Sequence, residues 1–139
     1  MIVVFTAILL LSGCKEEPQS ESKNTISTKE LSTAESTSIE KEIKKMKGVS
    51  DLRFIHSKDK LLVAIKVTNM DRLQLDKIQK KVKKKMNSEY PEMDITVSAD
   101  KKIFMKIEEL EAKHAKKKMS ERDIHKKIVS LIKLSKDEG

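Results

Sequence analysis

The stretch VSDLRFIHSKDKLLVAIKV, residues 49–67, decides the fold. Residues 49–56 include Leu52, Phe54 and Ile55, and residues 57–60 form a polar turn. In residues 61–67 an apolar side chain stands at every second position, which is the period of a strand. These alternating residues are Leu61, Val63, Ile65 and Val67. Two strand patterns joined by a short polar turn predict a β-hairpin.

Helical patterns lie on both sides of the hairpin. Before it, Ile39, Ile43 and Met46 recur at spacings of four and three, and Gly48 stands where helices commonly end. After it, Asp71 is the predicted cap of a helix that ends at the Tyr90-Pro91 pair. The apolar stripe of this second helix is Leu75, Ile78, Val82 and Met86.

The remaining chain adds one strand and two helices. Residues 93–98 read as a short strand, and Asp100 is the predicted cap of a helix carrying Ile103, Phe104, Ile107 and Leu110. A last helix over residues 120–134 opens with a Ser-x-x-Asp pattern. The sequence therefore predicts an α+β domain over residues 39–139. Its element order is α-β-β-α-β-α with an extra C-terminal helix, in two layers with the helices on one face of the sheet.

The N-terminal segment has the features of a lipoprotein signal. Residues 2–11 are an apolar run of signal-peptide length, too short to span a bilayer. The motif that follows, Leu11-Ser12-Gly13-Cys14, resembles the lipobox of bacterial lipoproteins. The resemblance implies that residues 1–13 are a signal peptide, cleaved after Gly13, and that the Cys14 thiol carries a diacylglyceryl group. Because Cys14 is the only cysteine, an intramolecular disulfide is excluded.

Composition changes after the cysteine. Residues 15–38 contain ten Ser and Thr among 24 residues and few apolar ones, so residues 14–38 are predicted to be a flexible tether. The chain has 30 Lys and Arg against 22 Asp and Glu, a net charge of +8. From residue 15 to residue 40 the charge is −3, and from residue 41 onward it is +11. The basic character therefore belongs to the domain.

No motif for catalysis or for a cofactor stands out. His56, His114 and His125 lack the spacing of metal ligands and are expected at the surface. No glycine-rich phosphate loop or nucleophile elbow is present in the sequence. Glu108, Glu109 and Glu111 are interpreted as solvated carboxylates that pair with nearby lysines of the same helix. The prediction is a non-enzymatic protein without cofactor or metal.

Two basic runs are the candidate contacts with an anionic surface. The first comprises Lys80, Lys81, Lys83, Lys84 and Lys85, and the second includes Lys116, Lys117 and Lys118. Lipid headgroups or anionic wall polymers are the nearest polyanions for a tethered domain. A solvated helix face that keeps the protein soluble is the alternative. Nucleic acid is not expected, because the chain has three Phe, one Tyr and no Trp for base stacking.

Two segments resemble the YhcN/YlaJ family of sporulation lipoproteins. One is Met46-Lys47-Gly48-Val49-Ser50-Asp51-Leu52, which leads into the hairpin. The other runs from Val82 through Tyr90-Pro91 to Ile95-Thr96-Val97-Ser98-Ala99-Asp100 and Ile103-Phe104. The resemblance implies a lipoprotein made during sporulation and held by its lipid on the extracytoplasmic face of a cell or spore membrane. It also implies an influence on germination or spore assembly, exerted through the membrane or a protein partner, and it supplies no catalytic residue.

One alternative stays open at this point. The same α-β-β-α-β unit also occurs in ring-forming and ligand-binding extracytoplasmic modules, so a self-assembling or ligand-binding lipoprotein that is not specific to sporulation fits the pattern as well.

Overall fold

The computed structural model describes residues 25–27, 33–116 and 119–137. From the first helix onward, helices and strands follow the predicted order α-β-β-α-β-α-α, which confirms the α+β class. The prediction lacked the strand β1 and the 3₁₀ helix η1. In chain order the elements are β1 (Thr25–Ser27), α1 (Thr33–Lys44), β2 (Val49–Ser57), β3 (Lys60–Val67), η1 (Asn69–Gln74), α2 (Leu75–Glu89), β4 (Asp94–Ser98), α3 (Lys101–Ala115) and α4 (Glu121–Asp137).

The strands form one sheet in the order β1-β2-β3-β4. The predicted hairpin is confirmed, since β2 and β3 are antiparallel, with Ser57 opposite Lys60 at the turn and Val49 opposite Val67 at the far end. β1 runs parallel to β2 and β4 runs parallel to β3. Helix α2 makes the crossover from β3 to β4 that a parallel pair requires.

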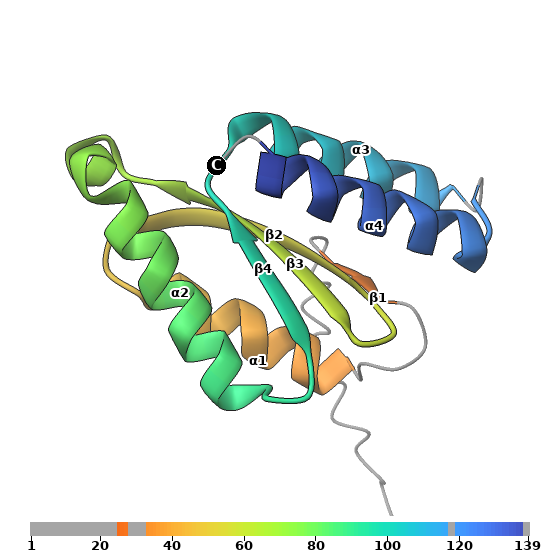
Figure 1. Ribbon diagram of the computed structural model, residues 1–139, viewed down its shortest axis with the longest axis horizontal. Coiled ribbons are helices and arrows are strands. Elements are labelled where there is room, and N and C mark those ends of the chain that lie inside the picture. The colour runs from red at the N-terminus through yellow and green to blue at the C-terminus, as the bar shows by residue number, and fades with distance from the viewer. Residues whose placement is uncertain (1–24, 28–32, 117–118, 138–139) are drawn as a thin grey trace, which may run out of the picture.

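Helices cover both faces of the sheet, so the domain has three layers and the two-layer prediction was wrong (Figure 1). Helices α1 and α2 pack on one side, called the α1/α2 face, and α3 and α4 pack on the other, the α3/α4 face. The cause lies in β3, where Leu62 and Ala64 are as fully buried as Leu61 and Val63. A strand that is apolar at successive positions is covered on both faces, and the alternation alone did not reveal this.

Each face has its own apolar cluster. On the α1/α2 face the buried members are Ile39, Ile43, Leu52, Phe54, Leu61, Val63, Ile65, Ile78, Val82, Met86, Ile95 and Val97. On the α3/α4 face they are Ile55, Leu62, Ala64, Ile103, Phe104, Ile107, Leu110, Ile124, Ile128, Leu131 and Ile132. The predicted stripes of all four helices supply many of these side chains, but two stripe residues differ from the prediction: Leu75 of α2 belongs to neither cluster, and Met46 follows the end of α1 and is only partly buried. Burial of apolar surface at about 25 cal/mol per Å² therefore holds each helix pair to the sheet.

Helix α1 ends at Lys44, so the predicted helix stop at Gly48 was wrong, and Gly48 lies in the turn that leads into β2. Gly48 has a φ of +94°, and a Cβ atom at this position would lie 2.5 Å from Cδ1 of Ile78. Both the left-handed backbone and the close approach of α2 require glycine here. Tyr90 ends α2: its backbone N–H donates to the carbonyl of Met86 at 2.8 Å, and its half-buried ring packs against the apolar cluster.

Side-chain caps begin three elements. Asp100 accepts from the backbone N–H of Lys102 at 2.6 Å, as predicted. The Ser120 hydroxyl donates to Oδ2 of Asp123 at 2.6 Å and accepts from the Asp123 backbone N–H at 3.2 Å, which confirms the start of α4. Thr68, not Asp71, caps the segment before α2. Its Oγ1 accepts from the Asp71 N–H at 3.3 Å and begins η1.

The folded part begins earlier than residue 39. Helix α1 starts at Thr33, and Ser36 of this helix is buried. Residues 33–38 are therefore helical, where a flexible tether was predicted. The strand β1 also lies within the predicted tether, at the edge of the sheet beside β2. The signal peptide, residues 1–13, and the remaining tether residues lie outside the described part.

Candidate functional site

The lysines of α2 separate into two groups. Lys80, Lys81 and Lys84 are exposed on the side of the helix that faces away from the sheet, and Lys77 lies with them. Within the described residues, no hydrogen bond or ion pair engages these four ammonium groups. Lys83 is exposed as well, and its charge acts on Asp94 of β4, where it contributes to lowering the pKa of that carboxyl after the larger effect of Lys60.

Lys85 has a structural role that the sequence did not reveal. Its Nζ lies 3.1 Å from Oε2 of Glu42 on α1 and 2.5 Å from Oε1 of Glu89 on α2. The hydrogen bonds to Glu89 and Glu42 raise the pKa of Lys85. This ammonium group thus bridges the two helices of the α1/α2 face and is not available as a free cation for a partner.

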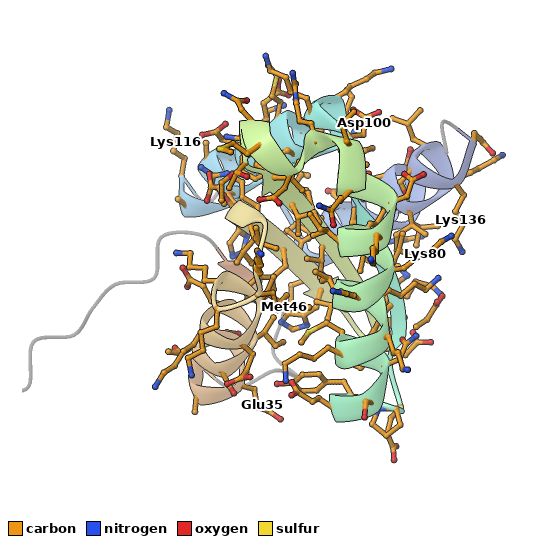
Figure 2. The ribbon with its side chains drawn as sticks, turned by 90° about the vertical axis from the view of Figure 1, so that its left-hand side faces the viewer. Glu35, Met46, Lys80, Asp100, Lys116 and Lys136 are labelled. Carbon is orange, nitrogen blue, oxygen red and sulfur yellow. The ribbon has the colours of Figure 1, made fainter. Side chains whose placement is uncertain are left out.

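The two predicted basic runs do not form one patch. The first run lies on α2, whereas Lys116 follows the C-terminal end of α3 on the other side of the sheet. Figure 2 shows Lys80 beside α2 and Lys116 at the opposite edge of the view. A flat anionic surface that contacts the exposed side of α2 would therefore lie on the opposite side of the domain from α3 and α4.

A charged network lies under α3. Arg53 of β2 donates through Nη2 to Oε1 of Glu108 at 2.9 Å and through Nη1 to Oε2 of Glu111. The side chains of Arg53 and Glu111 are 17% and 9% exposed. The two glutamates therefore pair across the domain with a strand residue, so the predicted pairing with helix lysines was wrong for both. The prediction of a solvated carboxylate was wrong for Glu111 only, because the Glu108 side chain is 55% exposed.

Burial sets the protonation of this network. It raises the pKa of Glu111 to about 7, although the Arg53 guanidinium acts in the opposite direction. Two cations lie near the Phe104 ring, with Nζ of Lys66 at 3.9 Å and Cζ of Arg53 at 5.3 Å from its centroid. These contacts hold α3 against the sheet. The network therefore has a structural role, and Glu111 is its residue with a shifted pKa.

The histidines are less exposed than predicted. His56 is fully buried on β2, and His114 is half-buried on α3. His125 of α4 is half-buried and shares a hydrogen bond of 2.8 Å between its Nδ1 and the Oγ of Ser57. Ser57 is only 3% exposed, so a substrate does not reach its hydroxyl group. This pair joins α4 to the end of β2 and is not a nucleophilic site.

A groove between α3 and α4 is too small for a typical ligand. Its volume is about 170 Å³, compared with about 300–1,000 Å³ for most small-molecule sites. Both apolar and charged side chains line it; the lining residues are Lys106, Glu109, Leu110, Lys113, Met119, Lys127, Ser130, Leu131 and Leu134.

No group of three or more His, Cys, Asp or Glu side chains among the described residues is placed to hold a metal ion. None of the helices in the described ranges is both long and apolar enough to cross a membrane.

Comparison with known families decides the relationship of the chain. A family model described as "Sporulation lipoprotein YhcN/YlaJ" matches residues 14–132. The chain belongs to the YhcN/YlaJ family of sporulation lipoproteins. This match confirms the resemblance seen in the sequence and extends it to residues 14–132. No curated protein and no solved structure matches the chain.

Several predicted site residues of this YhcN/YlaJ protein lie outside the described part. They are the lipid-attachment residue Cys14, the lipobox residues Leu11, Ser12 and Gly13, and two lysines of the second basic run, Lys117 and Lys118. Their roles stay predictions.

Two exposed apolar residues were missed by sequence reasoning. Met70 and Leu73 of η1 are 92% and 100% exposed, and no residue of η1 is buried. In the sequence, Met70 and Leu73 stand among polar residues and do not continue the apolar stripe of α2. Such a pair in a YhcN/YlaJ protein is easily mistaken for the first turn of the helix that follows.

Proposed function

We propose that this YhcN/YlaJ protein is a non-enzymatic lipoprotein of a spore membrane, held on its extracytoplasmic face by a lipid on Cys14. The domain is then a binding module that stays close to this membrane and influences germination or spore assembly. The observation that carries the proposal is the family match, which begins at residue 14.

The start of the match supports the position of the anchor. The apolar run and the Leu11-Ser12-Gly13 motif directly precede it, so the part shared with the family begins where a lipoprotein signal peptidase would cut. A lipoprotein carries at least two acyl chains, and each buried methylene contributes about 0.8 kcal/mol. Two chains therefore make the attachment stable, whereas one chain alone would be marginal.

The described domain supports a binding role over catalysis. Two polar groups that join a helix to the sheet, Arg53 with two glutamates and Ser57 with His125, are engaged with one another. The groove between α3 and α4 has less than the volume of an ordinary substrate site. What the domain offers to a partner is its surface, and the exposed lysines of α2 make part of that surface cationic.

Metabolic labelling tests the anchor. The full chain with a C-terminal tag is expressed in a sporulating endospore former fed with an alkyne fatty acid, and the purified protein is probed for the label. We expect labelled protein from the native chain, and from Cys14→Ala an unlabelled precursor that keeps residues 1–13.

Ser12→Ala is the matched control, because a small residue is kept and labelling should persist. Label on the Cys14→Ala variant would contradict the proposal. So would a native chain that is never labelled.

A further inference from the structure

The 3₁₀ helix η1 presents its two apolar side chains on one side. Residues three apart lie on the same side of a 3₁₀ helix, because it has three residues per turn. Met70 and Leu73 therefore project together, and their exposures of 92% and 100% mean that neither contributes to the core. The turn lies at the end of the molecule where the chain enters α2, at the upper left of Figure 1.

Polar contacts hold this turn in place without any buried side chain. The Thr68 hydroxyl donates to Oδ2 of Asp71 at 2.5 Å, and the backbone N–H of Thr68 donates to the carbonyl of Gly48 at 3.0 Å. The chain thus fixes a turn whose only large apolar groups face water. A single exposed leucine is ordinary in a protein surface, but an apolar pair on a fixed and fully exposed turn is not.

Charged residues of both signs flank the apolar pair in the sequence, with Asp71 beside Arg72 and Asp76 beside Lys77. Arg72 lies between its two members and is exposed, and Lys77 follows Leu73 by four residues at the start of α2. Lys77, Lys80, Lys81 and Lys84 continue along the outer side of α2 and surround a shallow depression that Asp76 also lines. Figure 2 shows η1 crossing above α1 and α2, with Lys80 on the outer side of α2. An apolar tip beside a row of lysines is complementary to a bilayer with anionic headgroups.

We propose that η1 and the outer side of α2 form a membrane-docking surface, in which Met70 and Leu73 enter the headgroup region of an anionic bilayer and the lysines of α2 contact its phosphates. This inference rests on the proposed function only for the location of the domain near a membrane. The surface provides a second contact, independent of the lipid on Cys14, and it turns the α1/α2 side of the domain toward the bilayer. Helices α3 and α4 then face away.

Vesicle binding tests the surface without the lipid. The full chain carrying Cys14→Ser is made by cell-free synthesis and sedimented with vesicles of phosphatidylcholine and phosphatidylglycerol in a 7:3 ratio. The apolar run of residues 2–11 is present in every variant, so its own affinity for lipid cancels in comparisons. We expect Met70→Ser with Leu73→Ser to weaken binding by about ten-fold or more, because two apolar side chains no longer leave water.

Charge variants separate the two parts of the surface. Replacing Lys80 and Lys84 by Gln should weaken binding to anionic vesicles by about five-fold for each lysine, and leave binding to pure phosphatidylcholine unchanged. The matched controls lie on the other side of the sheet. Met105→Ser on α3, and Lys126→Gln with Lys133→Gln on α4, change exposed methionine and lysine side chains and should leave binding as it is. Equal losses in test and control variants would overturn the proposal.

A fluorescent label locates the contact. The chain has one cysteine, so in the Cys14→Ser background Leu73→Cys provides a unique thiol for an environment-sensitive dye. We expect a blue shift of the emission on anionic vesicles, and none for a dye at Met105→Cys. An unshifted dye at residue 73, or equal shifts at both positions, would overturn the proposal. Because both residues are exposed, thermal unfolding followed by circular dichroism should show that the variants fold like the parent chain.

Self-association is the competing use of the same pair. Analytical ultracentrifugation without lipid distinguishes it: a dimer that Met70→Ser with Leu73→Ser dissociates, while vesicle binding persists, would overturn membrane docking. The two proposals fail separately. Vesicle binding by the Cys14→Ser chain does not depend on lipidation, and labelling of Cys14 in cells does not depend on η1.

Discussion

The two faces of the sheet bury apolar side chains to a similar degree but differ in how deeply their bridging charge is buried. On the α1/α2 face the bridging charge, Lys85, lies at the surface between Glu42 and Glu89. On the α3/α4 face the bridging charge, Arg53, is 17% exposed and reaches a glutamate that is 9% exposed. A charge at the surface keeps its hydration, whereas a buried charge depends on its partner. The α3/α4 face should therefore be the one whose stability responds to pH.

Truncation of a core phenylalanine has the largest expected effect and tests the similarity of the faces. Phe54 on the α1/α2 face and Phe104 on the α3/α4 face are both buried. Replacing either by Ala leaves a cavity, and we expect the free energy of unfolding to fall by about 3–5 kcal/mol in each variant. Guanidinium denaturation followed by circular dichroism measures this. A loss confined to Phe54→Ala would mean that α3 and α4 unfold separately from the sheet.

Removal of Arg53 tests the difference between the faces. Arg53→Met keeps much of the apolar stem but leaves Glu111 without its cation, so we expect a loss of about 2–3 kcal/mol at pH 8. At pH 5 the loss should be smaller, because burial raises the pKa of Glu111 to about 7 and its carboxyl group then holds a proton. Denaturation at the two pH values gives the comparison. Arg53→Lys, which keeps the charge, is the control, and equal losses at both pH values would contradict the prediction.

Glu111 should give the fold a pH dependence between its two pKa values. In the unfolded chain the pKa is near its ordinary value of 4.5, and in the folded protein it is about 7. Between these values the folded state binds more protons, so the free energy of unfolding falls as pH rises and changes no further above the folded pKa. In Glu111→Gln this slope should disappear. Unfolding measured at several pH values from 4 to 8 tests this prediction. An unchanged slope in Glu111→Gln would mean that another group causes the pH dependence of stability.

Loss of the surface bridge has the smallest expected effect. Lys85→Gln removes the ammonium group between Glu42 and Glu89, and exposed ion pairs of this kind contribute little to stability. We expect no measurable change in the denaturation midpoint at any pH between 5 and 8. A clear destabilisation would show that the charge of Lys85 is needed to hold α1 against α2, and the contrast between the faces would then be weaker.

Local patterns in the sequence predicted most of the fold. The hairpin, the cap at Asp100 and the stripe residues Ile78, Val82 and Met86 of α2 each depend on residues within a few positions of one another. The number of layers did not follow in the same way. It depends on whether Leu62 and Ala64 find a second helix pair to pack against, and this is settled only when α3 and α4 fold back over the hairpin.

The site was predictable to a smaller extent. The exposure of Lys80, Lys81 and Lys84 follows from their place opposite the apolar stripe. The partners of charged residues do not follow from local sequence, because Arg53 and Glu111 are 58 residues apart and meet only in the folded domain. The apolar pair of η1 was missed for a related reason. Whether a leucine near a helix start points into the core or into water depends on the turn geometry set by Thr68.

Tyr90 has a practical consequence for studying this domain. It is the only tyrosine, the chain has no tryptophan, and its ring lies against the apolar cluster of the α1/α2 face. Intrinsic tyrosine fluorescence therefore reports on that face alone, whereas circular dichroism reports on helices of both faces. Coincident unfolding curves from the two signals would establish that the whole domain melts as one unit. In the wild-type chain, Tyr90 thus serves as an intrinsic fluorescent probe of the α1/α2 cluster.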